Sequence, residues 1–312
     1  MSGAGRALVI GSRGSRLALW QAHWVRRRLE AAGRSVGIRE IRTSGDRFVE
    51  QSLAVIGGQG LFVKEIEEAL LARAIDVAVH SLKDLPTMQP PGLVVACVPE
   101  REEVRDLLLA RGASTLRALP TGSIVGTGSP RRACQILNLR PDLAVRDLRG
   151  NVDTRVAKWQ RGDYDAIILA CAGVRRLELP VGGAPLDLDA MLPAVGQGAL
   201  AIETRADDAD AREVLAPTHH AGTAAAVAAE RAFLRRLGGG CQAPIAAYAR
   251  LEDGALRLRG LVAEPSGRRM VRGSASGPPG EAESIGAALA EEFLGRGARD
   301  LLPRVATGTG TS

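Results

Sequence analysis

The chain has 312 residues, of which 46% are hydrophobic and 24% are charged, a composition typical of a globular protein with two or three domains. Lysine and arginine outnumber aspartate and glutamate by 41 to 35, which favours an anionic ligand. Aromatic residues make up only 3%, which argues against a nucleic-acid partner because bases stack on exposed rings, and the longest apolar run, residues 166–174, is too short to cross a membrane.

The first hundred residues alternate short β-rich runs with amphipathic stretches, as strands and crossover helices do in a mostly parallel sheet. We predict strands at 7–11, 36–42, 75–80 and 93–98, and helices at 18–32 and 62–73. Gly33 lies where the first helix would end in a left-handed residue. These elements indicate one α/β domain.

A charged stretch at 100–106 is followed by a second alternation of strand and helix. It predicts strands at 123–127, 143–147 and 166–170, and helices at 130–139 and 152–160. The glycine- and proline-rich segment 179–198 is expected to be a loop, after which 199–203 returns as a strand to the first domain. Two crossings between the domains would form a hinge.

The last third of the chain has another pattern. We predict an alanine-rich helix at 223–237, strands at 245–250, 256–263 and 269–275 separated by turn residues, and a final helix at 283–294. The predicted fold is therefore α/β, with two doubly wound domains and a C-terminal α+β domain that holds a three-stranded antiparallel sheet. The predicted domains are 1–99 completed by 199–217, then 100–198, and then 218–312.

Three segments combine a strand end, a helix-capping residue and arginines, and this combination predicts anion binding. In 127–132, Ser129 suits an N-cap and Pro130 the first helical position, so free backbone N–H groups would point where Arg131 and Arg132 also reach. Segments 149–155 and 11–16 repeat the pattern. The residues alone do not decide between a carboxylate and a phosphate, since no phosphate-binding glycine loop is present.

Asp84 lies in 78–86, where a predicted strand enters a polar turn closed by a proline. A carboxylate that faces arginines is poorly suited to binding anions, but it can act as a general acid or as the counter-charge to a transient cation. The alternative is that Asp84 or Ser81 only caps a turn.

Cys241 differs from the other three cysteines. Cys97, Cys134 and Cys171 lie in apolar or helical surroundings and are expected to be small buried hydrophobes. Cys241 follows three glycines, so it is either a loop residue without a chemical role or an accessible thiol able to form a covalent link. The wide spacing of the four predicts neither a disulfide framework nor a metal site. With no signal peptide recognisable at the N-terminus, we expect a reduced, cytoplasmic protein.

Together these segments resemble the porphobilinogen deaminase (hydroxymethylbilane synthase) family, from about residue 8 to the final helix. The most specific motifs are AVHSLKDLP at 78–86, LRGNVDTR at 148–155, LPAVGQGAL at 192–200, AERAF at 229–233 and GGCQAPI at 239–245. The resemblance implies that the first two domains are similar to type II periplasmic binding proteins. It also implies that the third carries a dipyrromethane cofactor, joined as a thioether to Cys241 and lying in the cleft between the other two.

The resemblance implies a transferase that joins four porphobilinogen units head to tail with loss of ammonia and then releases the linear tetrapyrrole by hydrolysis, a step in haem and porphyrin biosynthesis. Asp84 matches the catalytic aspartate, and basic residues match positions that bind the acetate and propionate groups of the pyrroles. The implied cofactor-binding residues are Cys241, Lys83, Asp84, Ser129, Arg131 and Arg132, and the implied substrate-binding residues are Arg13, Ser15, Lys64, Thr127, Arg149, Arg155 and Arg176.

Three residues depart from the family's commonest pattern: Gln59 replaces a lysine, Gly128 a serine and Arg16 a proline. The family is usually monomeric, and its product is compatible with a hand-off to a uroporphyrinogen-III synthase. The strongest alternative is a non-catalytic polycarboxylate-binding protein on the same scaffold, such as a solute receptor or an effector-sensing module. In that protein Asp84 and Cys241 would have no role.

Overall fold

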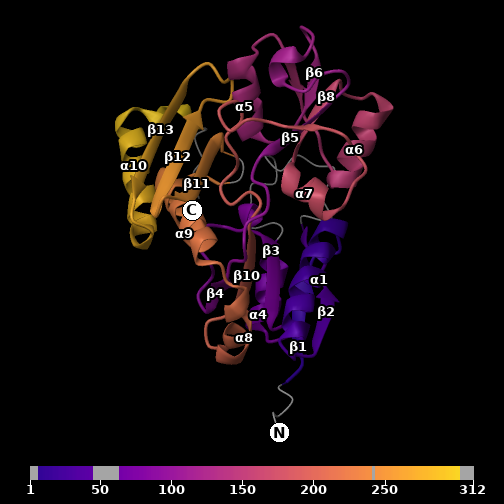
Figure 1. The fold of residues 1–312 in the computed structure, drawn as a ribbon, viewed down its shortest axis with the longest axis vertical. Helices are drawn as coiled ribbons and strands as arrows, with labels where there is room; N and C mark the ends of the chain where they lie inside the picture. Colours follow the sequence, from indigo (N-terminus) through magenta and orange to yellow (C-terminus); the bar gives the residue numbers. More distant parts are fainter. Residues whose placement is uncertain (1–5, 45–62, 241–242, 303–312) are drawn as a thin grey trace, which may run out of the picture.

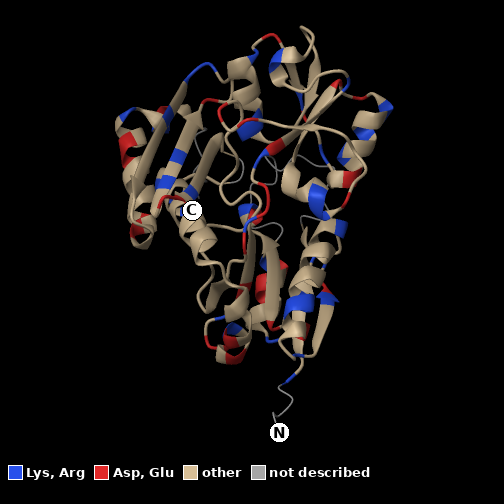
Figure 2. Cartoon of the chain, in the orientation of Figure 1, with Lys and Arg blue, Asp and Glu red and all other residues tan. Residues whose placement is uncertain are grey.

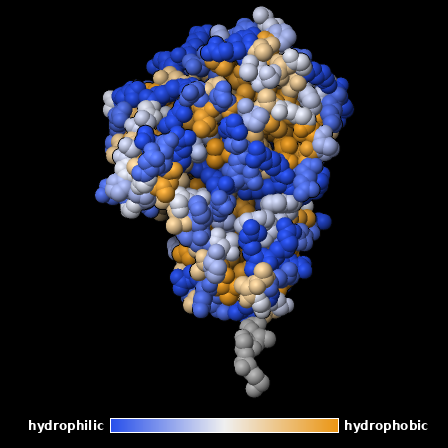
Figure 3. Space-filling model, in the orientation of Figure 1, coloured by the Kyte–Doolittle hydropathy of each residue, from blue (hydrophilic) through white to orange (hydrophobic). Residues whose placement is uncertain are grey.

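The computed structural model describes residues 6–44, 63–240 and 243–302, which form three units (Figure 1). The N-terminal unit is at the bottom of the view, the middle unit above it, and the C-terminal unit beside both. Polar residues dominate the face seen in Figure 3, with apolar patches only between them. Within the part of the chain that is described, each helix is too short or too polar to cross a bilayer.

The N-terminal unit contains a five-stranded sheet in the order β2-β1-β3-β10-β4. Strand β1 runs parallel to β2 and β3, while β10 runs antiparallel to both β3 and β4. Its strands are β1 (Leu8–Ser12), β2 (Val36–Glu40), β3 (Val77–Ser81), β4 (Leu93–Cys97) and β10 (Leu200–Arg205), and its helices are α1 (Arg16–Ala31), α4 (Lys64–Leu71) and α8 (Ala209–Leu215), followed by η3 (Ala216–Thr218). Apolar side chains of β1 and α1, among them Ile10 and Val25, fill the core on one face.

The middle unit has a second five-stranded sheet, in the order β7-β6-β8-β5-β9. Its strands are β5 (Asp106–Ala110), β6 (Ile124–Gly126), β7 (Ala144–Arg146), β8 (Ala166–Ala170) and β9 (Ala184–Pro185), and its helices are η2 (Leu116–Ala118), α5 (Pro130–Leu139), α6 (Val152–Arg161) and α7 (Cys171–Arg176). The expectation of mostly parallel sheets was incomplete, because β5 is antiparallel to both of its neighbours, as β10 is in the first sheet. Strand β5 was not predicted.

The C-terminal unit consists of α9 (Ala221–Leu237), the antiparallel strands β11 (Ile245–Glu252), β12 (Ala255–Ala263) and β13 (Met270–Gly277), and α10 (Ala282–Gly295), with η4 (Pro279–Glu281) and η5 (Ala298–Leu301). Phe233 of α9 and Phe293 of α10 pack edge to face at 5.2 Å between ring centroids, which fixes the two helices together under the sheet. The predicted fold class is confirmed, whereas the exact domain boundaries stay predictions.

Two crossings connect the N-terminal and middle units, one between β4 and β5 and one between β9 and β10. They lie against each other, because the amide of Glu102 donates to the carbonyl of Gly198 at 3.2 Å. Gly198 has a φ of +86°, and a Cβ there would lie 2.4 Å from the Glu102 carbonyl oxygen. Only glycine allows this close approach.

Candidate active site

Asp84 lies in a short 3-10 turn, η1 (Leu82–Asp84), immediately after β3. Leu82 and Leu85 are buried on either side of it, so the exposed Asp84 is held on a fixed loop. Arg231 of α9 donates to the Pro86 carbonyl at 2.7 Å and thus ties this loop to the C-terminal unit.

Lys83 and Arg155 show that the Asp84 loop faces the middle unit. Burial lowers the pKa of Lys83 to about 8, opposed by the charge of Asp84 and aided by those of Arg132 and Arg131. Burial also lowers the pKa of Arg155 to about 10, again with Arg132 lowering it and Asp84 raising it. Side chains from two units therefore share one electrostatic environment.

Arg131 and Arg132 begin helix α5, as the sequence predicts, with Ser129 as N-cap and Pro130 in the first turn. Both guanidinium groups are almost fully buried against the carboxylate of Asp106 at the start of β5. Arg131 Nη1 lies 2.7 Å from Asp106 Oδ2, and Arg132 Nη2 lies 2.7 Å from Asp106 Oδ1. The sequence analysis missed Asp106, which belongs to the charged stretch that it treated only as a boundary.

The other predicted arginines of the middle unit each donate to one partner. Arg149 Nε donates to Asp147 at 2.7 Å, and Arg155 Nε donates to the Gly150 carbonyl at 2.7 Å. Arg176, at the end of α7, donates from Nη2 to the carbonyl of Gly198 at 2.7 Å, and burial lowers its pKa to about 10. Each of the three keeps N–H groups beyond the one used in these bonds.

The predicted substrate-binding residues of the N-terminal unit make separate local contacts. Arg13 is half-buried in the loop that joins β1 to α1, and Ser15 caps α1 by accepting from the amide of Ala18 at 3.3 Å. Lys64 begins α4 with an exposed side chain 3.9 Å from Glu68. Among the described contacts, none joins Lys64 to the arginines of the middle unit.

Thr127 and Ser129 lie together at the end of β6. The buried Thr127 hydroxyl accepts from the amide of Ser129 at 3.2 Å, and the Ser129 side chain makes no capping bond to α5 within the described residues. Gly128 between them has little space, since a Cβ there would lie 3.0 Å from the Leu148 carbonyl oxygen.

Cys241, like Gln59, lies outside the described residues. Its neighbours along the chain are held close together, because the amide of Ala243 donates to the carbonyl of Gly240 at 2.9 Å. The other three cysteines are buried free thiols, as predicted. Burial raises the pKa of Cys97 to about 12 and those of Cys134 and Cys171 to about 11, so these thiols are poor nucleophiles at neutral pH.

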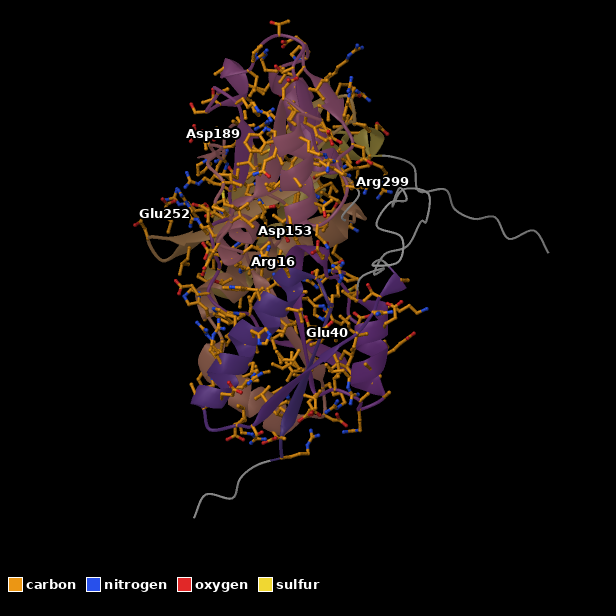
Figure 4. All side chains as sticks on the ribbon, turned by 90° about the vertical axis from the view of Figure 1, so that its right-hand side faces the viewer. Arg16, Glu40, Asp153, Asp189, Glu252 and Arg299 are labelled. Carbon is orange, nitrogen blue, oxygen red and sulfur yellow. The ribbon has the colours of Figure 1, made fainter. Side chains whose placement is uncertain are left out.

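Arg16 joins the N-terminal unit to the middle unit. Its Nη1 lies 2.6 Å from Asp153 Oδ1 in the first turn of α6, and Figure 4 shows the two side chains where the units meet. Nearby, Trp20 of α1 lies 5.8 Å below the guanidinium of Arg176. Arg16 thus forms an exposed contact between the two units.

Comparison with known proteins identifies the family. A family model described as "Porphobilinogen deaminase, dipyromethane cofactor binding domain" matches residues 8–213, and one described as "Porphobilinogen deaminase, C-terminal domain" matches residues 224–295. The chain belongs to the porphobilinogen deaminase family. The porphobilinogen deaminase of Syntrophotalea carbinolica is 50% identical over 299 residues, which cover 95% of each chain.

Solved structures outside the porphobilinogen deaminase family are more distant. A putative methionine-binding lipoprotein from Bacillus subtilis is 11% identical, with a TM-score of 0.42 over 69% of this chain and 90% of that one. A nutrient-binding protein from Burkholderia cenocepacia, bound to methionine, is 15% identical, with a TM-score of 0.42 over 67% of this chain and 90% of that one.

The residues present fit an anionic form of the dipyrromethane cofactor that the porphobilinogen deaminase family model names. Basic side chains surround the Asp84 loop, and the buried Nε of Arg131 has no hydrogen-bond partner among the described residues. Buried polar atoms in native proteins are nearly always paired, so an orphaned cationic donor indicates a place for an anionic ligand. Lys83, Arg131 and Arg132 are the residues that would hold it.

Proposed function

We propose that this chain is a hydroxymethylbilane synthase, which condenses four porphobilinogen molecules head to tail with loss of ammonia and releases the linear product by hydrolysis. Membership of the porphobilinogen deaminase family along nearly the whole chain supports the reaction. The observation that carries the site assignment is that Asp84, Lys83 and the arginines of the middle unit share one electrostatic environment, although they come from two units.

The cofactor would be a dipyrromethane attached to Cys241. Its free pyrrole carbon would bond to the first substrate, and the terminal pyrrole of the growing chain would bond to each later one. Lys83, Ser129, Arg131 and Arg132 bind its carboxylates. Each charge-assisted hydrogen bond to a carboxylate contributes about 1.5–3 kcal/mol, so a few of them account for tight retention of a small polyanion.

Asp84 is the proposed catalytic residue. Its carboxylate would hold the proton that leaves with ammonia and then face the positive charge that develops on the pyrrole nitrogen. Arg13, Ser15, Lys64, Thr127, Arg149, Arg155 and Arg176 would bind the acetate and propionate groups of the substrate and the growing chain. We further propose that the enzyme works as a monomer in the cytoplasm and passes its product to a uroporphyrinogen-III synthase.

Intact-protein mass spectrometry tests the attachment. The purified protein should carry a two-ring adduct that Cys241→Ser removes and that Cys171→Ser, a buried control, keeps. An unmodified protein with full activity would refute the attachment and leave the non-catalytic alternative.

The role of Asp84 is tested by turnover. Asp84→Asn should keep the adduct but lose about a hundred-fold or more in kcat, the usual contribution of a positioned acid. The exposed Asp163, whose carboxylate pairs with Arg161, provides a control, because Asp163→Asn should leave kcat unchanged. Normal kcat in Asp84→Asn would contradict the assignment.

A further inference from the structure

Asp106 lies at the centre of a network of buried hydrogen bonds. It is fully buried and accepts from both arginines at the start of α5: Arg131 donates through Nη1 and Nη2 at 2.7 and 3.3 Å, and Arg132 through Nη2 and Nε at 2.7 and 3.1 Å. One carboxylate therefore fixes two guanidinium planes. Burial alone would raise the pKa of Asp106, but the charges and hydrogen bonds of the two arginines hold it well below its ordinary value.

Each arginine also donates a hydrogen bond to a backbone carbonyl. Arg131 Nη1 also donates to the Leu192 carbonyl at 2.7 Å, and Arg132 Nη1 donates to the Ile168 carbonyl at 3.0 Å. Each guanidinium has five N–H groups, of which three are used in these contacts, so two of each have no partner among the residues that the structure describes. The two side chains are 4% and 6% exposed, so their positions are fixed by these contacts.

The same carboxylate is connected to both crossings between the units. Asp106 follows the first crossing directly, and Gln197 of the second crossing donates from Nε2 to Asp106 Oδ1 at 2.9 Å and to the Val104 carbonyl at 2.7 Å. A shift of either crossing would therefore move the atoms that hold Arg131 and Arg132. No other described carboxylate contacts these two arginines.

We propose that Asp106 is a positioning residue, which orients the free edges of Arg131 and Arg132 so that they bind the two carboxylates of one pyrrole ring of the cofactor. This inference rests on the proposed function, because it takes Arg131 and Arg132 as cofactor ligands. Asp106 itself does not touch the cofactor or the reacting atoms.

The direction in which Asp106→Asn changes the binding of the cofactor distinguishes positioning from simple charge balance. If Asp106 only neutralised the arginines, Asp106→Asn would make the site more positive and strengthen the binding of an anionic ligand. If Asp106 positions them, the amide NH2 of asparagine faces guanidinium donors, the planes lose their orientation, and binding weakens. Loss of the aligned hydrogen bonds to one carboxylate is worth about ten- to a hundred-fold in affinity.

The experiment measures three quantities in each variant: the melting midpoint, the fraction of protein with the two-ring adduct by intact mass, and the KM and kcat for porphobilinogen. Asp76 is the matched control, since it is also buried, lies in the N-terminal unit and pairs with Arg205 at 3.0 Å and Arg6 at 2.6 Å. Asp76→Asn should lower the melting midpoint and leave the adduct and KM unchanged.

Asp106→Asn should lower the melting midpoint by a similar amount but also lower the adduct fraction at least ten-fold or raise KM by that factor. An adduct fraction and KM that match those of Asp76→Asn, or tighter binding, would overturn the proposal. If Asp106→Asn does not fold, Asp106→Glu serves, since it keeps the charge but moves the carboxylate by about 1.5 Å. Wild-type adduct and KM in that variant would also overturn positioning.

Arg132→Lys distinguishes this inference from the proposed function. Lysine keeps the charge but lacks the planar fork, so the variant should lose adduct or raise KM about ten-fold. If Arg132→Lys is impaired and Asp106→Asn is not, the proposed function stands and the role of Asp106 fails. If Arg132→Lys binds the cofactor normally, the assignment of Arg132 as a cofactor ligand fails, and the inference about Asp106 fails with it.

Discussion

Glu230 offers the sharpest test of how the three units are held together. Its fully buried carboxylate in α9 binds Arg101 of the first crossing at 2.6 and 3.1 Å and accepts from the amides of Gly196 at 2.7 Å and Ala249 at 2.8 Å. Gly196 belongs to the second crossing and Ala249 to β11. One side chain thus connects both crossings to the C-terminal unit.

The perturbation is Glu230→Gln, which keeps the shape but replaces one acceptor oxygen by an NH2 group that faces other donors. Removing one partner of a buried ion pair costs about 3–5 kcal/mol, because the remaining charge stays buried without compensation. For a protein of this size each kcal/mol lowers the melting midpoint by about 2–4 °C, so the expected decrease is on the order of 10 °C.

Thermal unfolding followed by circular dichroism measures the effect. Glu283→Gln is the matched control, since Glu283 of α10 pairs with Arg235 of α9 at 2.7 Å but both side chains are exposed. That pair should contribute less than about 1 kcal/mol. Equal midpoints for the two variants would refute the reasoning that burial makes the Glu230 contacts strong.

Three further predictions concern the pH dependence of stability, the close backbone approach at Gly198 and the exposed Arg16–Asp153 pair between the units. Burial raises the pKa of Glu67 to about 7, so the folded state retains a proton that the unfolded chain releases at lower pH. Stability should therefore fall by about 2 kcal/mol as pH rises from about 5 to 7 and level off above 7, and Glu67→Gln should flatten this decrease in urea unfolding. Gly198→Ala should cost about 2–4 kcal/mol, because its φ is positive and a Cβ would meet the Glu102 carbonyl; a wild-type urea midpoint would contradict this. Arg16→Gln and Asp153→Asn should each change the free energy of unfolding by less than about 1 kcal/mol, since the pair is exposed, and a larger loss in the same assay would contradict a weak surface contact.

Most of the fold could be predicted because apolar periodicity and turn residues can be recognised within single segments of the sequence. The apolar spacing of α1 and the turn residues between β11, β12 and β13 are visible in single segments. The return of residues 199–203 to the first sheet was predicted and is confirmed by β10. The elements that were missed include β5, the short helices α7 and α8, and the two-residue strand β9. Strand β5 begins inside the charged stretch that was interpreted only as a boundary, and α7, α8 and β9 are too short to show a clear helical or strand period.

The site was predicted only in part, for a related reason. Motif residues such as Asp84 and the arginines after strand ends can be found from the sequence, but their partners cannot. Asp106 lies 25 residues before Arg131, and Arg16 lies 137 residues before Asp153, so no local pattern connects them. Basic and acidic residues are interspersed along the chain (Figure 2), so the sequence indicated many cations around one aspartate. The structure shows that two of them, Arg131 and Arg132, already pair with Asp106.

The distribution of strong and weak contacts indicates how the space between the units can change. On one side, Glu230 and Arg101 form a buried pair beside the crossings, and Arg231, the next residue of α9, holds the loop that follows Asp84. On the other side, Arg16 and Asp153 form an exposed pair that water screens. A hinge needs strong contacts at its axis and weak ones at its opening, since the weak contacts must break at each movement. We therefore expect the cleft to open at the Arg16 side as the pyrrole chain lengthens, while the Asp84 loop keeps its place on α9.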